Sequence, residues 1–508
     1  MVGLLLVVSW VFPLVLAACS PWVRARWPAA LAPLPALGAA LLLPAGSSAA
    51  LDSLFLGVHL ELDETGRLFL GFGALVWLLA GVSLAFQSDL ESRRLRLFFL
   101  LAMAGNLLLV LAADMLTFYL GFAAMGLSTY GLVVHRGGQR ARRAGRVYLA
   151  WTLVGELALF TAVAMMVAAS GSTLLADLAG VAIPALAVGL LIFGFGIKLA
   201  LPGLHVWLPL AYPAAPALAA AVLSGPMINA GLLGWLRFLP PGGSLDAGWG
   251  SLLFALGAAG IVLGTVAGLA QRDPRAVLGY SSIAKMGLVS AVFGIVASQP
   301  QLAGVALPAL VLFAVHHSLV KSALFLGIGA WERIGARTWL MIVLAVPALA
   351  LAGAPLTAGA IAKEGLGGAL AGAGPDLLFT LSALGTALLM IRLFWLLRLR
   401  PARRASGSGA TLTVASTAAA VSLWLPFSPA DLSFSAGGLA PLAVALALAA
   451  GFRLLTQNGA LKLPRIPPGD LLHLLPKLRR LSSDFKGSPL VRRVRRRDAR
   501  PASASRGA

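Results

Sequence analysis

Hydrophobic residues along the chain come in continuous blocks of about twenty, separated by short polar connections. A helix needs about that length to cross roughly 30 Å of hydrocarbon at 1.5 Å per residue. Strands of a membrane barrel would alternate polar and apolar residues over about ten positions. Residues 182–195 and 440–450 are instead apolar throughout. The pattern predicts an all-α polytopic membrane protein and excludes a barrel.

The blocks predict about 14 to 15 membrane-spanning helices. They lie at residues 2–20, 27–48, 67–87, 95–113, 115–134, 147–169, 183–201, 214–238, 250–270, 277–298, 304–329, 338–362, 376–398, 411–427 and 436–456. The first block ends in Leu16-Ala17-Ala18-Cys19, which looks like a lipoprotein cleavage site. No Lys or Arg precedes it, as an export signal requires, so we expect an uncleaved first span.

Composition supports the membrane class and narrows the chemistry. Hydrophobic residues make up 59% of the 508 residues and charged residues only 11%, whereas soluble proteins carry about 25%. A net charge of +21 would suggest nucleic-acid binding in a soluble protein, but here the Arg residues lie between apolar blocks and near the C-terminus. We therefore expect no nucleic-acid partner. Cys19 is the only cysteine, which excludes disulfides and thiolate metal sites.

The basic residues also predict an orientation, because cytoplasmic loops are enriched in Lys and Arg. The basic connections all fall on one side of the predicted spans: Arg24/Arg26, Arg93/Arg94/Arg96, Arg136 to Arg146, Arg272/Arg275, Arg333/Arg337 and Arg398 to Arg404. The N-terminus is therefore predicted to lie outside and the C-terminus in the cytoplasm, and the expected location is a bacterial cell inner (plasma) membrane. The basic tail either touches anionic headgroups or a partner, or only fixes the orientation.

Lysine is used differently from arginine. The chain has seven Lys and 32 Arg, and four of the Lys lie within or at the breaks of apolar spans: Lys198, Lys285, Lys321 and Lys363. A charge at the bilayer centre costs at least about 2.5–3.5 kcal/mol. A buried ammonium gives up its proton readily, whereas a guanidinium does not. Snorkelling or a packing ion pair would account for one such Lys more easily than for four. The set therefore predicts proton transfer.

Other titratable residues accompany these lysines. Glu156 lies in the sixth span and Glu364 directly follows Lys363. His317 is four residues before Lys321 and shares its helix face, whereas His316 is expected to point elsewhere as a hydrogen-bonded packing residue. A Glu and a Lys separated by a variable gap can act as a proton switch.

Two of the spans contain helix breakers near a lysine. Lys198 precedes Pro202-Gly203, and Lys363 follows Gly353-Ala354-Pro355. Proline removes a backbone donor, and broken helices at membrane depth are tolerated only where they line protein or water. Discontinuous helices that carry ionisable groups are typical of ion transporters.

The motifs around these residues resemble the antiporter-like subunits of respiratory complex I, membrane-bound hydrogenases and Mrp sodium/proton antiporters. The resemblance covers residues 55–400 and rests on residues 114–130, 198–209 (KLALPGLHVWLP), 211–238, 271–287 (QRDPRAVLGYSSIAKMG), 316–327 (HHSLVKSALFLG) and 353–364 (GAPLTAGAIAKE). It implies two inverted five-helix repeats, each with a broken helix, a hydrated chain of proton-carrying residues, and other membrane subunits as partners. The implied domains are residues 1–94 (three spans with an external loop), 95–240 and 241–400 (the repeats), 401–458 (C-terminal spans) and 459–508 (a basic cytoplasmic tail).

The resemblance assigns roles position by position. Lys198 matches the Lys of the first broken helix, Lys321 that of the eleventh span, Lys363 the terminal Lys or Glu of the second broken helix, and His317 a position that is often His. Two positions depart from the family, because its fifth-span Glu falls on Ala123 and its eighth-span Lys on Asn229. Lys285 is an additional charge.

These departures leave alternatives open. Either Glu156 replaces the missing acid while Lys285 or water near Asn229 bridges the gap, or the first half-channel is broken and the chain is a structural subunit. A stand-alone cation/proton exchanger with no redox partner and a membrane partner for inorganic-carbon uptake are further alternatives, and whether sodium is carried is left open. The chain has no flavin, iron–sulfur or nucleotide motif, so we expect no cofactor and no electron transfer within it.

Overall fold

The computed structural model describes residues 2–20, 22, 27–54, 57–86, 93–243, 245–374, 376–399, 415–419 and 439–457. Ten helices in this part are long and apolar enough to cross a membrane. They are α1 (Val2–Cys19), α4 (Glu64–Phe86), α5 (Arg93–Leu111), α6 (Met115–Val134), α7 (Gly138–Ser170), the continuous stretch from α10 (Ala217–Val222) to α11 (Ile228–Phe238), α12 (Ala247–Leu269), α13 (Pro274–Ser298), α14 (Ala303–Ile334) and α17 (Asp376–Arg398). The predicted all-α polytopic membrane class is confirmed.

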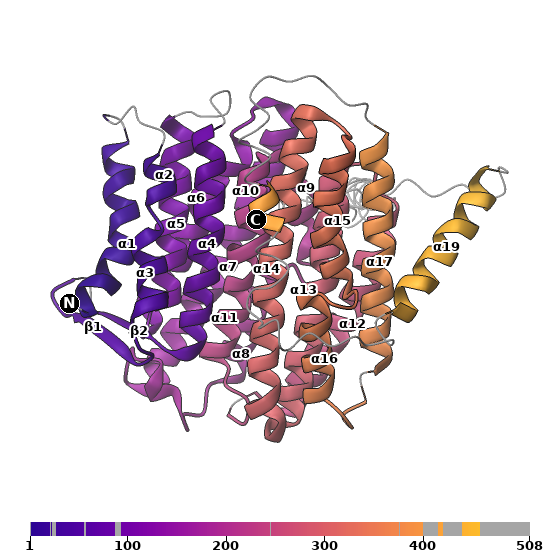
Figure 1. The fold of residues 1–508 in the computed structure, drawn as a ribbon. Helices are drawn as coiled ribbons and strands as arrows, with labels where there is room; N and C mark the ends of the chain where they lie inside the picture. The colour runs from indigo at the N-terminus through magenta and orange to yellow at the C-terminus, as the bar shows by residue number, and fades with distance from the viewer. Residues whose placement is uncertain are drawn as a thin grey trace, which may run out of the picture.

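Shorter helices complete the bundle. They are α2 (Pro28–Leu31), α3 (Leu34–Leu42), α8 (Ala185–Lys198), α9 (Leu208–Ala214), α15 (Thr338–Ala352), α16 (Ala358–Ala369) and α19 (Leu439–Gln457). The helices stand side by side, and the chain runs across the bundle from α1 at one edge to α17 and α19 at the other (Figure 1). Helix α13 and the α10–α11 stretch are buried almost all round, whereas only 28% of α1 is buried. The apolar core therefore centres on α10, α11 and α13.

Neighbouring helices approach closely where glycines face each other. A Cβ atom on Gly105 of α5 would lie 2.5 Å from the backbone nitrogen of Met125 in α6, and one on Gly121 would lie 2.6 Å from that of Leu109. Gly257 and Gly287 make a similar close approach between α12 and α13. Small residues that let backbones touch are the usual means of helix association in lipid, where hydrophobic burial drives little.

Both predicted helix breaks are present. Helix α8 ends at Lys198 and is followed by an irregular stretch before α9, and α15 ends at Ala352 before α16 begins at Ala358. Each break contains one non-glycine residue in the left-handed region, Ala200 with a φ of 56° and Leu356 with a φ of 63°. The Pro and Gly residues of the sequence therefore located both interruptions.

A two-stranded antiparallel hairpin was not predicted. Strand β1 (Ser47–Leu51) pairs with β2 (Val58–Leu62), with Ser47 opposite Leu62. The predicted second span, 27–48, is wrong at its end because helix α3 stops at Leu42 and the chain turns into β1. Burial alternates along β2, as expected for a short half-buried strand.

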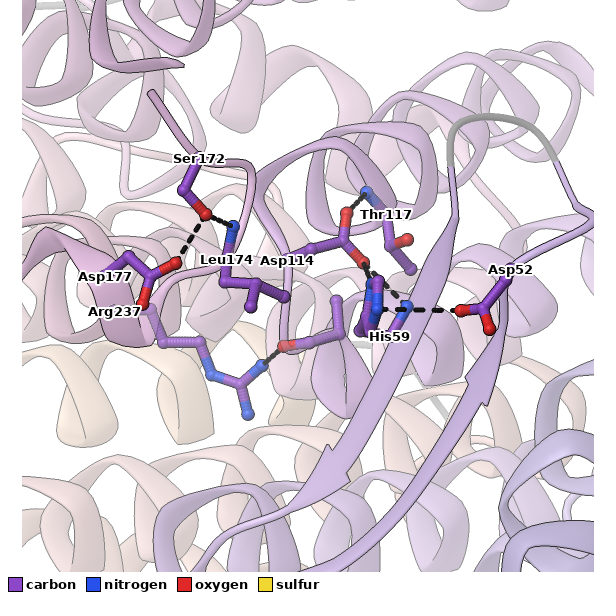
Figure 2. A network of polar contacts seen from close by, with 9 residues as sticks. Asp52, His59, Asp114, Thr117, Ser172, Leu174, Asp177 and Arg237 are labelled. Atoms are coloured by element: carbon purple, nitrogen blue, oxygen red, sulfur yellow. Dashed lines mark hydrogen bonds and ion pairs between the residues drawn. The ribbon is translucent and has the colours of Figure 1, made fainter. Parts of the chain in front are cut away.

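A polar network ties this hairpin to the helix ends nearby (Figure 2). Asp114 caps α6 by accepting from the backbone nitrogen of Thr117 at 2.7 Å, and its other oxygen accepts from that of His59 in β2 at 2.9 Å. At the end of α11, Arg237 donates to the carbonyl oxygens of Ala112 and Val110. The network replaces the hydrogen bonds that these backbone groups would otherwise lack.

Several predictions on organisation remain predictions. The inverted relation of the two repeats and the boundaries of the five predicted domains are not tested by the arrangement of the helices. The predicted last span, 436–456, corresponds to α19, which lies beside α17. Of the predicted span 411–427 only residues 415–419 are described, as helix. The basic tail, 459–508, lies outside the described residues.

Candidate functional site

A small cavity at the first helix break brings Glu156 and Lys198 together. Its volume is about 20 Å³, and it is lined by residues of α6, α7, α8 and the segment that follows the break. Glu156 comes from the middle of α7, and Lys198 is the last residue of α8. A water molecule needs at least about 10–15 Å³ by this measure, so the cavity holds about one.

The Lys198 ammonium is surrounded by aromatic groups. Its Nζ atom donates to the hydroxyl oxygen of Tyr148 at 3.4 Å and lies 5.7 Å from the centre of the Phe122 ring and 5.8 Å from that of Tyr148. The Tyr148 hydroxyl in turn donates to the carbonyl oxygen of Gly126 at 2.9 Å. Ring faces attract a cation in a desolvated site, so this pocket accommodates the ammonium without a direct carboxylate contact.

Glu156 makes no ion pair within 4 Å with any described residue, although it shares the cavity with Lys198. It is 6% exposed, and its Oε2 atom has no hydrogen-bond partner among the described residues. A buried carboxylate oxygen without a protein partner must carry a proton or contact water, because leaving it bare is costly. The pair is therefore arranged across a gap rather than closed.

A second polar group lies between the two breaks, where α11 meets α14. The Asn229 side-chain nitrogen donates to Ser318 Oγ at 2.5 Å and to the carbonyl oxygen of Gly225 at 3.2 Å. Lys321, one helical turn beyond Ser318, has no exposed surface, and its Nζ atom donates to the carbonyl oxygen of Leu278 at 2.9 Å. Gly225 belongs to a π-helical turn, Leu223–Met227, of the kind frequent at functional sites.

A second cavity of about 20 Å³ lies at the other break. Its ionisable lining residues are Lys285 of α13, His316 and His317 of α14, and Lys363 of α16. The Nζ atom of Lys285 lies 5.6 Å from the centre of the Phe313 ring. Neither ring nitrogen of His317 has a partner among the described residues. Four groups that can exchange protons therefore meet around one water-sized space.

One sequence-based expectation needs correction here, and one stays open. His316 is hydrogen-bonded to the carbonyl oxygen of Ala350 at 3.3 Å, as expected, but it also lines the cavity beside His317 instead of pointing elsewhere. Lys285, one of the two bridges that the sequence left open, lies in the second cavity with Lys363, and its bridging role stays a prediction. The rotation of α13 about its axis determines which neighbours Lys285 contacts, and the sequence pattern does not fix that rotation.

Glu364 is not brought together with the other predicted residues. It is exposed and is not among the residues that line the second cavity, although Lys363 is. Adjacent helical residues point about 100° apart, so only one of the two can face a small cavity. Its predicted place in the proton path stays a prediction.

Sequence reasoning missed the aromatic residues of the first cavity, above all Tyr148. A signal was available, because Tyr148 and Glu156 are eight residues apart on one helix and such positions lie on a similar face. Trp207, also in the lining, donates from its ring nitrogen to the carbonyl oxygen of Ile197 at 2.8 Å and so fixes the segment after the break.

Comparison with solved structures identifies the fold. A chain of the Mrp complex from Dietzia sp. DQ12-45-1b superposes with a TM-score of 0.69 and 22% identity, covering 89% of this chain and 95% of that chain. A chain of the membrane-bound sulfane sulfur reductase, an archaeal respiratory membrane complex, superposes with a TM-score of 0.73 and 20% identity, covering 95% of this chain and 96% of that chain. At these identities the likeness shows that the fold is shared.

Sequence comparison identifies the family. Hydrogenase-4 component B of Escherichia coli (strain K12) is 34% identical over 221 residues, which are 41% of this chain and 33% of that protein. The aligned part is thus a third of that relative's length. Residues 112–389, more than half of the chain, match the family described as NADH:quinone oxidoreductase/Mrp antiporter, TM. The chain therefore belongs to this family of membrane subunits.

Proposed function

We propose that the chain is a proton-translocating membrane subunit of an assembly of the complex I, hydrogenase or Mrp type. The observation that carries this proposal is the pair of water-sized cavities at the two helix breaks, one holding Glu156 and Lys198 and the other Lys285, His317 and Lys363. Buried ionisable groups in a membrane interior are retained mainly on transport paths.

In the first half, the proton would pass between Glu156 and Lys198. Both residues line one cavity with room for about one water, and Tyr148 supplies a hydroxyl that contacts the ammonium. A close carboxylate stabilises the ammonium, so the lysine keeps its proton when the carboxylate is close and releases it most easily when the carboxylate is distant. A change in the gap would therefore switch the direction of transfer. In this proposal Glu156 replaces the acid that the family carries at the position of Ala123.

Between the cavities, Asn229, Ser318 and Lys321 form the connecting group. Asn229 cannot itself accept and release a proton, but its side-chain amide positions the Ser318 hydroxyl one turn from Lys321. Lys321 would receive the proton and pass it towards His317, which lies four residues earlier on the same face of α14. From there the cavity with Lys285 and Lys363 continues the path.

The cavities favour protons over sodium. Each holds only about 20 Å³, and the titratable residues that line the second one are all amines or imidazoles. Hard cations are held by several oxygen ligands. In the described part of the chain, no group of three or more His, Cys, Asp or Glu residues could hold a metal ion. Sodium/proton exchange stays the alternative.

Other membrane subunits would be the partners and the source of energy. The similar chains with solved structures are parts of the Mrp complex and of an archaeal respiratory membrane complex. The chain itself would be non-redox, embedded in a bacterial inner membrane with the N-terminus outside. A structural subunit with an interrupted first half-channel is the competing function, because Ala123 and Asn229 depart from the family.

The test is Glu156→Gln in the full-length chain. Proton uptake would be followed with a pH-sensitive dye in membrane vesicles under an imposed potential. We expect uptake to fall to the level of vesicles without the chain, because Gln cannot exchange a proton. The matched control is Glu64→Gln, an exposed carboxylate at the start of α4. Unchanged uptake in Glu156→Gln would refute the path, and no uptake by the wild type would favour the structural subunit.

A further inference from the structure

A third cavity lies where the basic connections of the chain meet. Its volume is about 350 Å³, within the range of roughly 300–1,000 Å³ of small-ligand pockets. Its charged lining comes from the α6–α7 connection and the starts and ends of three helices: Arg136, Arg140, Asp273, Arg275 and Glu332. It is far larger than the two water-sized cavities, and the proposed proton path does not use it.

The charges in this cavity do not cancel. Glu332 accepts from Arg136 at 3.1 Å and from Arg275 at 2.5 Å, and Asp273 accepts from Arg140 at 3.0 Å. Three guanidinium groups thus face two carboxylates, which leaves one positive charge. The side chains of Arg136 and Arg140 are 35% and 66% exposed, and each uses one nitrogen to bond a described residue. Since a guanidinium has five N–H donors, donors remain for a ligand.

Arg275 is the buried part of the site. Its side chain is 3% exposed, and its two terminal nitrogens donate to Glu332 and to the carbonyl oxygen of Ala215. Its Nε atom has no partner among the described residues. A buried cationic side chain with an unused donor is costly unless an acceptor fills the cavity. The start of α13, directly before Arg275, adds the positive end of a long helix.

We propose that this cavity binds a phosphate group, carried either by an anionic lipid headgroup or by free phosphate. Guanidinium groups match phosphate with paired N–H donors, and helix starts favour anions. Glu332 and Asp273 hold the three arginines apart and in place, so that an anion completes the cluster. This proposal does not depend on proton transport. Its competitor is a purely structural set of ion pairs that ties helix ends together.

The test uses the purified full-length chain and two probes. Retention of phosphatidylglycerol against phosphatidylcholine would be measured by native mass spectrometry, and inorganic phosphate against chloride would be titrated by thermal unfolding. Arg140→Gln is expected to weaken binding about tenfold, since it removes a charged donor. The control is Arg143→Gln, an exposed arginine on the same helix outside the cavity lining, which should bind as the wild type does.

A second variant is expected to strengthen phosphate binding instead of weakening it. Glu332→Gln frees Arg136 and Arg275 and raises the net charge of the cavity, so phosphate should bind about tenfold more tightly and should restore any lost thermal stability. A structural cluster would lose stability without rescue by either probe. Retention of phosphatidylglycerol alone would identify the ligand as a lipid headgroup. Binding of inorganic phosphate alone would identify it as a free anion. Binding of neither probe, or equal weakening by Arg143→Gln, would overturn the proposal.

Discussion

Lys321 shows at the scale of one residue how far the interior departs from a packed apolar core. Its side chain is completely buried, and its ammonium has one acceptor among the described residues, the carbonyl oxygen of Leu278. Burial of a charged amine without an opposite charge is costly. We therefore propose that Lys321 is kept for exchange of its proton rather than for packing.

The corresponding prediction concerns Lys321→Met. Methionine fills nearly the same space without a charge, so the free energy of unfolding should change by less than about 1.5 kcal/mol or increase. Proton uptake should fall to background, and Lys321→Arg should abolish it as well because a guanidinium keeps its proton. Thermal unfolding and dye-based uptake measure the two effects. Retained transport in Lys321→Met would remove Lys321 from the path.

At the scale of elements, the two broken helices share one feature. Each places a non-glycine residue in the left-handed region, Ala200 at the first break and Leu356 at the second. That conformation costs an ordinary residue roughly 1–2 kcal/mol, and such strain clusters at functional sites. The surrounding bundle holds both breaks in a form that the local sequence does not favour.

Leu356 allows this strain to be measured, since its side chain is 54% exposed and little packing is lost on truncation. Leu356→Gly should raise the free energy of unfolding by up to about 1 kcal/mol, because glycine adopts positive φ freely. The same truncation at Leu377, which is 70% exposed but helical, should lower it by about 0.5–1 kcal/mol. If thermal unfolding showed that both variants change the free energy of unfolding in the same direction, the proposed strain at Leu356 would be contradicted.

The elements also show what the sequence could predict. Apolar blocks located most of the helices, and Pro202-Gly203 and Gly353-Ala354-Pro355 located the breaks. Both signals are local, because the length of an apolar block and a Pro or Gly residue each affect only the backbone nearby. Rotation about a helix axis is not local. It places Lys363 and Lys285 in one cavity and leaves Glu364 exposed. The aromatic surroundings of Lys198 likewise depend on packing between helices distant in sequence.

At the scale of the whole molecule, the proposed path joins the two cavities through the buried group around Lys321. Lys198 lies in the first cavity and Lys363 in the second, and Asn229 and Ser318 lie on the helices between them. Such an arrangement can work as one path in series or as two independent half-channels. The two cases differ in how variants combine.

A double variant decides between them. In a series path, Lys198→Met and Lys363→Met each reduce proton uptake to background, and the double variant is no worse, because one interruption already stops transfer. Independent half-channels would leave about half of the uptake in each single variant, and only the double variant would abolish it. We expect the series result, since the proposed path runs from the cavity of Lys198 through Lys321 to the cavity of Lys363. Arg142→Gln, an exposed cation outside the cavities, is the control. Substantial uptake in both single variants would show that Lys321 does not join the two halves.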